Sequence, residues 1–143
     1  FGPSLGHFDM DPCAAMEPLW RSADVMLNKE DDGLSSEWKG RVWLNPPYST
    51  PLISSFMKKM GEHGDGIALI MPKFGSKMFR EDILPNCTAI FILDQRIRFY
   101  TPDGQQQKSP ICTNILVAYG EDNVRAIRES GLKGQFLFPE KRQ

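Results

Sequence analysis

An amide, two prolines and a phenol follow one another in the tetrapeptide Asn45-Pro46-Pro47-Tyr48, at the end of an apolar run. Each proline fixes its own backbone φ angle, so the groups around it are held in one geometry. The Asn45 amide oxygen and the Pro46 carbonyl can then accept two hydrogen bonds from one NH₂ group. These bonds would draw electron density onto that nitrogen and keep its lone pair free to attack a methyl carbon.

Tyr48 adds a flat ring on which a base could stack, which is worth about 1–3 kcal/mol per base. The alternative for the whole tetrapeptide is a Pro-Pro turn that ends a strand and leaves a tyrosine on the surface. The apolar run before the motif and the helical pattern after it favour the chemical interpretation.

Carboxylates form a second group of candidates. Asp9 and Asp11 alternate along an extended segment, which places both on one side and would suit acid–base work or ligand binding. The alternative is a solvated strand end. Asp31 and Asp32 precede Gly33, where a plain surface turn is an equal alternative. Cys13 invites a nucleophile interpretation, but no partner histidine is evident, so a small buried residue is favoured.

Basic residues form a third group. Arg96 and Arg98 share one face of an extended segment and are followed by Phe99 and Tyr100, a combination that suits phosphate and base contacts. The polar face of an ordinary strand is an equal alternative. The segment after Pro72 adds three more candidates for contact with nucleic acid, namely Lys73, Lys77 and Arg80.

The elements that must position these residues alternate between strands and helices. Apolar runs predict strands at 6–10, 42–44, 66–71, 88–93, 111–119 and, as an edge strand, 135–138. Helical spacing predicts helices from Pro51 to the glycines at 61 and 64, from Ser76 to about residue 84, and around residues 124–132. Residues 13–40 are expected to be irregular.

This alternation predicts an α/β fold with a mostly parallel sheet flanked by helices. Right-handed crossovers place the carboxyl ends of parallel strands at one edge, where ligands bind in such sheets. Asp11-Pro12 and Asn45-Pro46-Pro47-Tyr48 both follow strands. We therefore expect them to lie side by side over one crevice.

Composition narrows the classes of protein that fit. A chain of 143 residues with 41% hydrophobic and 24% charged residues suits a single domain over residues 1–143. The net charge of −1 requires a local basic patch for any nucleic acid. No apolar run reaches the roughly 18 residues of a membrane span. The three cysteines show no pattern and predict a reduced, cytoplasmic protein. The two histidines show no metal-ligand spacing. Because the sequence starts with Phe1, we expect that an upstream segment is missing.

Several motifs in order resemble one known family. "FDMDPCA", "EDDGLSSEW" and "GRVWLNPPYS", followed by "LIMPKFGSKMF", "RIRFYTPDG" and "SPICTNILVAYG", resemble the phage-type DNA adenine (Dam-like) methyltransferases over nearly the whole chain. The resemblance implies a Rossmann-like, S-adenosylmethionine-dependent methyltransferase fold, reduced in size. It also implies a phage or prophage origin and action in the cytoplasm of a bacterial host.

The resemblance assigns roles to particular residues. The catalytic loop is Asn45, Pro46, Pro47 and Tyr48. Cofactor binding falls to a first motif and an acidic position, which comprise Phe8, Asp9, Asp11, Pro12, Cys13, Asp31 and Asp32. The glycine-rich loop usual in methyltransferases is absent, and Cys13-Ala14-Ala15 stands in its place.

The sequence therefore predicts transfer of a methyl group from S-adenosylmethionine to the amino group of adenine in double-stranded DNA. The target base would be flipped into the pocket at residues 45–48, with no metal, no membrane and no covalent intermediate. So short a chain predicts either a short or relaxed target sequence or a homodimer that grips the DNA. The alternatives are methylation of RNA adenine, cytosine or a protein glutamine, or a non-catalytic nucleic-acid-binding module that kept the fold.

Overall fold

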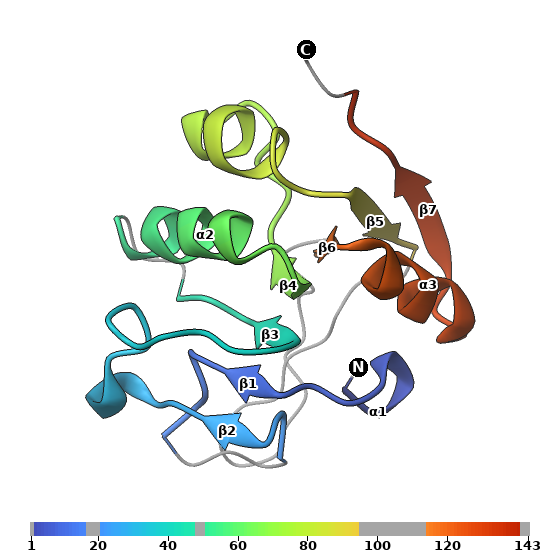
Figure 1. The fold of residues 1–143 in the computed structure, drawn as a ribbon. Coiled ribbons are helices and arrows are strands. Elements are labelled where there is room, and N and C mark those ends of the chain that lie inside the picture. The colour runs from blue at the N-terminus through green and yellow to red at the C-terminus, as the bar shows by residue number, and fades with distance from the viewer. Residues whose placement is uncertain (1, 17–20, 48–50, 95–113, 141–143) are drawn as a thin grey trace, which may run out of the picture.

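The centre of the molecule is a seven-stranded sheet in the computed structural model, which describes residues 2–16, 21–47, 51–94 and 114–140 (Figure 1). Its strands are β1 Met10–Asp11, β2 Val25–Met26, β3 Val42–Leu44, β4 Gly66–Ile70, β5 Ala89–Leu93, β6 Ile115–Tyr119 and β7 Gly134–Leu137. The helices are α1 Gly2–Leu5, α2 Leu52–His63 and α3 Glu121–Glu129, with a 3₁₀ turn η1 Lys29–Asp31 and a π-helical turn η2 Phe79–Ile83.

The strands lie in the order β2-β1-β3-β4-β6-β5-β7. β2, β1, β3 and β4 are parallel neighbours. β6 is antiparallel to both β4 and β5, and β7 is antiparallel to β5. The predicted α/β fold is confirmed. The sheet was expected to be mostly parallel, but neighbouring strands are parallel only from β2 to β4. Apolar runs report burial and carry no information on strand direction, which depends on the connections between strands.

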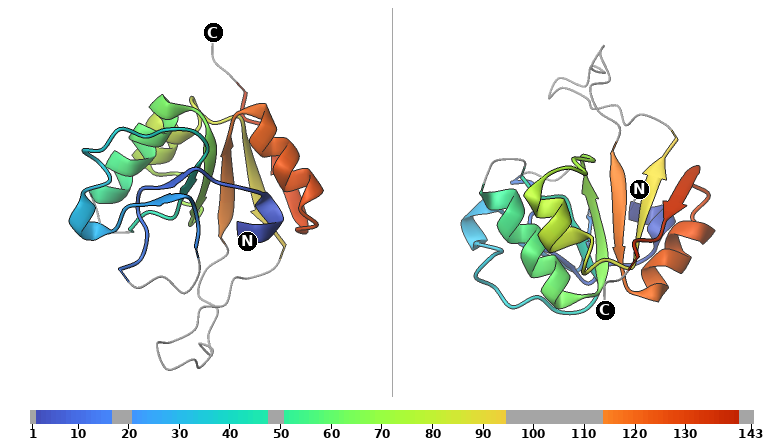
Figure 2. Two further views of the ribbon diagram at one scale, coloured as in Figure 1. Left: turned by 60° about the horizontal axis from the view of Figure 1, so that its bottom comes forward. Right: turned by 90° about the horizontal axis from the view of Figure 1, so that it is seen from above.

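Helices cover the sheet on both faces (Figure 2). On one face α2 and η2 bury a first core cluster, in which Met57, Met60 and Phe79 are fully inaccessible. On the other face α1 and α3 bury a second cluster through Leu5 and Ile127. Strands β4 and β6 are buried along their whole length, which explains why both read as uninterrupted apolar runs.

Most predicted elements are present, with shifted bounds. The strand predicted at 6–10 is the shorter β1, and β2 was not predicted at all within the segment expected to be irregular. The helix after Pro51 was expected to end at Gly61 and Gly64; α2 continues through Gly61 to His63, and Gly64 ends it with φ 78°, which confirms the second of these glycines. That left-handed geometry is the usual reason for glycine after a helix.

Ser76 lies where the sequence predicted the start of a helix, and its hydroxyl accepts from the Phe79 backbone N–H. The turns that follow widen into η2, a π-helical geometry that the sequence did not reveal. The predicted segment at 96–100 and the first residues of the 111–119 strand lie outside the described residues. Within the ranges that are described, no helix has the length and apolar character needed to cross a bilayer.

Candidate active site

The two predicted tips leave the sheet side by side. β1 pairs in parallel with β3 through Met10 and Val42. Asp11-Pro12 at the end of β1 and Asn45-Pro46 directly after β3 therefore lie at the same edge of the sheet (Figure 1). The predicted proximity of the two segments is confirmed by this pairing.

Asn45 is the first residue after β3. The three residues of β3 are buried, Asn45 is exposed, and Pro46 is buried again. Within the described residues, the Asn45 amide takes part in no hydrogen bond. The buried strand β3 and the buried Pro46 thus flank an exposed carboxamide at the edge of the sheet, which is unpaired among the described residues. Tyr48 lies outside the described residues.

Asp11 is a buried carboxylate at the end of β1, with 4% of its surface exposed. One oxygen accepts the Cys13 backbone N–H at 3.0 Å, and the other accepts the hydroxyl of Ser22. Burial raises the pKa of Asp11, while the hydrogen bonds from Ser22 and Cys13 act in the opposite direction. These two donors hold the carboxylate in one orientation. Sequence reasoning missed Ser22, because a serine inside an irregular segment gives no local signal of its partner.

Cys13 is half-buried beside Asp11 and packs against the first core cluster. Burial, with a smaller contribution from the Asp11 charge, raises the pKa of the Cys13 thiol to about 11. The group is therefore a neutral thiol near pH 7. A neutral thiol is a weak nucleophile, which supports the interpretation of Cys13 as a small packing residue.

The acidic turn is shaped by its own side chains. Asp31 accepts the Asn28 backbone N–H at 2.9 Å, which together with the Asn28 side chain forms a capping box around η1. Asp32 has a left-handed backbone with φ 54° and accepts the hydroxyl of Ser35 at 2.7 Å. Both carboxylates are exposed. Each can bind a ligand through its remaining lone pairs, and each also has the local role that the surface-turn alternative required.

Close packing holds this turn against the end of β1. A Cβ atom on Gly33 would lie 1.9 Å from the carbonyl oxygen of Pro12, so only glycine fits there. The Trp38 indole N–H donates to the Gly33 carbonyl at 2.8 Å. Lys59 of α2 donates to the carbonyls of Leu34 and Ser36 at 2.6 and 2.5 Å. We call Gly33, Trp38 and Lys59 the turn clamp; the sequence patterns did not indicate it.

Two predicted cofactor residues lie elsewhere. Phe8 is buried in the second core cluster, with its ring 5.5 Å from that of Trp43 and 4.2 Å from the Arg41 guanidinium carbon. Asp9 accepts the Arg41 backbone N–H at 2.7 Å, on the amino-terminal side of β1. The structure thus brings Asp11, Pro12 and Cys13 together with the Asp31-Asp32 turn. Phe8 and Asp9 have different surroundings.

The predicted basic residues after β4 all lie on the surface. Lys73, Lys77 and Arg80 are exposed, and Lys77 forms a weak ion pair with Glu81 at 3.9 Å. They follow the carboxyl end of β4, which is the parallel neighbour of β3. Phe74 is exposed by 42% beside them, its ring 5.2 Å from that of Phe79, and was not singled out from the sequence. Arg96 and Arg98 lie outside the described residues.

Comparison with known proteins shows the family to which the chain belongs. The DNA N-6-adenine-methyltransferase (Dam) family matches residues 3–127. A DNA N-6-adenine-methyltransferase of Haemophilus phage HP1 (strain HP1c1) is 30% identical over 96 residues, covering 64% of this chain and 54% of the relative. The chain thus spans about half the length of that relative, and no solved structure is significantly similar to it. A match over residues 3–127 covers most of the 143 residues, so this chain belongs to the DNA N-6-adenine-methyltransferase (Dam) family.

Proposed function

We propose that this protein methylates the exocyclic amino group of adenine in DNA, with S-adenosylmethionine as the methyl donor. The observation that carries the proposal is the exposed Asn45 amide directly after β3, together with the buried Asp11 carboxylate at the end of β1, the parallel neighbour of β3. An amide suits an amino substrate and a carboxylate suits a cationic cofactor. The family match supports both assignments.

The proposed cofactor region consists of Asp11, Pro12 and Cys13 with the turn at Asp31 and Asp32. S-adenosylmethionine carries an ammonium group and ribose hydroxyls, which are hydrogen-bond donors, so a region rich in carboxylate oxygens fits it. The exposed oxygens of Asp31 and Asp32 are the accessible acceptors. Asp11, which is buried, would set the local charge and shape the loop. The bound cofactor supplies an activated methyl group.

The chain's own residues would act on the target base. Asn45 Oδ1 and the Pro46 carbonyl accept the two N–H groups of the adenine amine, which localises the nitrogen lone pair and aims it in line with the methyl carbon. Tyr48 would stack on the flipped base. The amine nitrogen would gain the methyl group as the sulfur–methyl bond of the donor breaks, and it would then release one proton to water. Neither a metal nor a covalent bond to the protein is required for these steps.

DNA would approach from the edge of the sheet where β1, β3 and β4 end. Lys73, Lys77 and Arg80 are exposed after β4, and Arg96 and Arg98 complete the proposed phosphate contacts. Exposed Phe74 among the first three offers an apolar surface for a base or sugar. We further propose that the sheet is a reduced, Rossmann-like methyltransferase fold, since four parallel strands are followed by the antiparallel strand β6.

The proposal is tested by incubating the full chain with labelled S-adenosylmethionine and duplex DNA, followed by digestion to nucleosides. Label in N6-methyladenine is the expected result. Label confined to cytosine, or transfer to RNA or to a protein glutamine in parallel reactions, would overturn the assignment of substrate. Absence of transfer together with absence of cofactor binding would overturn the assignment as an enzyme.

A further inference from the structure

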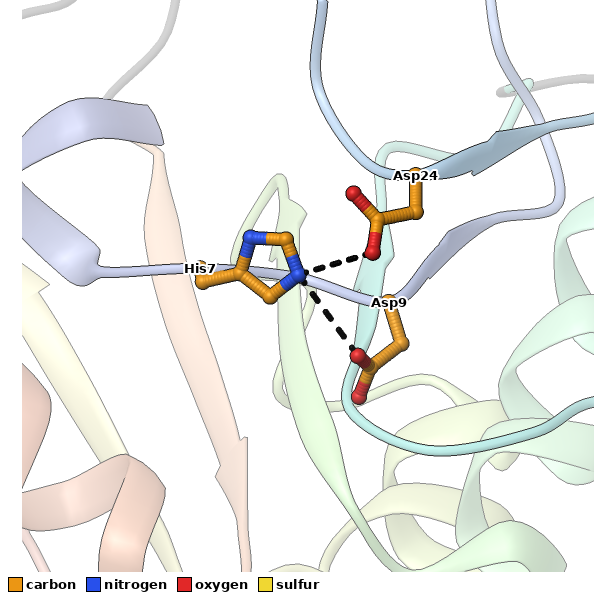
Figure 3. Close-up of side chains that lie close together, drawn as sticks. All are labelled: His7, Asp9 and Asp24. Atoms are coloured by element: carbon orange, nitrogen blue, oxygen red, sulfur yellow. Dashed lines mark hydrogen bonds and ion pairs between the residues drawn. The ribbon is translucent and has the colours of Figure 1, made fainter.

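Three side chains with metal-binding atoms meet at the opposite ends of β1 and β2 from the proposed active site. His7 Nε2 lies 3.0 Å from Asp24 Oδ2 and 3.6 Å from Asp9 Oδ1 (Figure 3). One ligand atom from each residue falls within 4.8 Å of the others. All three side chains are exposed, with 66%, 50% and 61% of His7, Asp9 and Asp24 accessible. The cluster can therefore exchange ions with solvent.

Backbone pairing fixes the relative positions of the three residues. His7 and Asp9 are two apart in an extended segment, so their side chains lie on the same side of the chain. The segment before β2 is tied to them by hydrogen bonds from Asp24 N to the Phe8 carbonyl at 3.2 Å and from Val25 N to the Asp9 carbonyl at 3.0 Å. These bonds place Asp24 opposite the pair.

The Asp9 carboxylate is also oriented by a backbone group outside the cluster. Its Oδ2 accepts the Arg41 backbone N–H at 2.7 Å, which leaves Oδ1 directed toward His7. Gly40 packs so closely on this carboxylate that a Cβ atom there would lie 2.3 Å from Oδ2. Hydrogen bonds that orient a ligand from outside the coordination shell are a regular feature of metal sites.

We propose that His7, Asp9 and Asp24 bind a divalent transition-metal ion such as zinc, with water in the remaining positions. Zinc binds imidazole nitrogen and carboxylate oxygen at about 2.0–2.2 Å, which separates neighbouring ligand atoms by roughly 3–3.5 Å. The separations from His7 are already close to this range. The imidazole favours zinc, cobalt or nickel over magnesium, which prefers oxygen ligands and water. Two carboxylates neutralise the charge of the ion.

The bound ion would act as a structural link. The described pairing of β2 with the sheet consists of Met10 with Val25 and Asp11 with Met26. A metal held by residues from both segments would add a cross-link at this edge. Because it binds the folded arrangement, it would raise the stability of the fold by linkage. This inference does not depend on the proposed methyl transfer.

The test titrates the full, metal-free chain with Zn²⁺ by calorimetry, with Mg²⁺ as the hard-ion comparison, and follows the melting temperature in parallel. We expect saturable binding of one Zn²⁺, a rise in melting temperature, and no comparable effect of Mg²⁺. His7→Gln and Asp24→Asn should each weaken Zn²⁺ binding by about tenfold or more. Both side chains are exposed, so both variants should fold, and circular dichroism checks this.

His63→Gln is the matched control, because His63 is the other histidine of the chain and lies on α2. It should retain Zn²⁺ binding. Three results would each overturn the proposal: no saturable Zn²⁺ binding by the wild type, unchanged affinity in His7→Gln or Asp24→Asn, or equal loss in His63→Gln.

Discussion

Asn45 is proposed to bind the target amine because its amide is exposed directly after the buried strand β3. Asn45→Ala would remove one of two acceptors for the target amine without altering the packing of β3. Loss of one such group typically lowers turnover by about 10²- to 10³-fold. Single-turnover methyl transfer measures this loss, and calorimetry with S-adenosylhomocysteine should show unchanged affinity. A near-normal rate in Asn45→Ala would refute the role of the amide.

Burial of the ionised Asp11 carboxylate lowers the stability of the fold, although its charge is proposed to help bind the cofactor. Its pKa is raised in the folded protein, so the native state holds its proton more tightly than the unfolded state. Its contribution to stability is therefore most favourable at low pH and declines as pH rises from the ordinary value of 3.8 through the raised pKa. Asp11→Asn removes this charge and should lessen that decline. Urea denaturation of both proteins across this pH range measures the difference.

The same Asp11→Asn variant should bind S-adenosylhomocysteine more weakly, because it lacks the negative charge of the proposed cofactor region. The melting-temperature shift caused by this ligand is the measurement. A variant that is less stable than the wild type at neutral pH, or that keeps the full shift, would contradict this account of Asp11.

At the scale of elements, the turn clamp connects α2 to the proposed cofactor region. Lys59→Met would remove the donor to the Leu34 and Ser36 carbonyls and free the acidic turn from α2. Gly33→Ala would push the turn away from Pro12, since a Cβ has no space there. Both changes should raise the KM for S-adenosylmethionine several-fold and leave kcat nearly constant, because they act on the position of the turn and leave Asn45 intact.

Two variants control for general loss of stability. Lys59→Arg keeps the charge and the donors and should restore most of the affinity. Gly131→Asn changes a glycine with open space around it and φ +85°, a backbone conformation that asparagine tolerates, so it should leave KM unchanged. An equal fall in kcat and affinity in Lys59→Met would indicate that the clamp has no specific link to the cofactor.

At the scale of the whole molecule, Asn123 joins three parts of the fold. It is fully buried, accepts from Arg41 Nε at 2.5 Å, and donates to Asp65 Oδ1 at 2.9 Å and the Tyr119 carbonyl at 2.7 Å. Asn123→Ala would leave these partners short of hydrogen bonds, which costs about 1–3 kcal/mol for a buried group. We expect a loss of about 2 kcal/mol in the free energy of unfolding. Urea denaturation measures it, and exposed Glu121→Ala serves as the control.

The charge of the whole chain sets how DNA must be bound. With a net charge of −1, affinity has to come from a local group of cations. Removing one cation that neutralises a phosphate reduces the slope of log affinity against log salt by about 0.9. Lys73→Ala with Arg80→Ala should therefore reduce the slope by about 2, whereas Arg125→Ala on α3 should not change it. Fluorescence anisotropy over a salt series decides this, and a slope unaffected by the double variant would exclude this surface.

The sequence by itself determined the buried strands and the two tips. Apolar runs at 66–71 and 88–93 reported strands because all of β4 and all but one residue of β5 are buried, and buried strand residues must be apolar. The pair Asp11-Pro12 and Asn45-Pro46 could be placed at one edge because strands alternating with helices run parallel. The antiparallel entry of β6 and the edge strand β2 could not be predicted, since neither leaves a periodic signal of its direction or pairing.

Only the tertiary structure decided what surrounds each candidate residue. Asp9 and Asp11 are equivalent in the sequence, yet Asp11 is buried beside Ser22 while Asp9 faces His7 and Asp24. The turn clamp likewise depends on Lys59 of α2 reaching the carbonyls of Leu34 and Ser36. These contacts join residues that are far apart in the chain. The chemistry of each side chain depends on whether the packed fold buries it or leaves it exposed to water. Local patterns specify which residues are buried, whereas the partners of each polar group are set by the assembled fold.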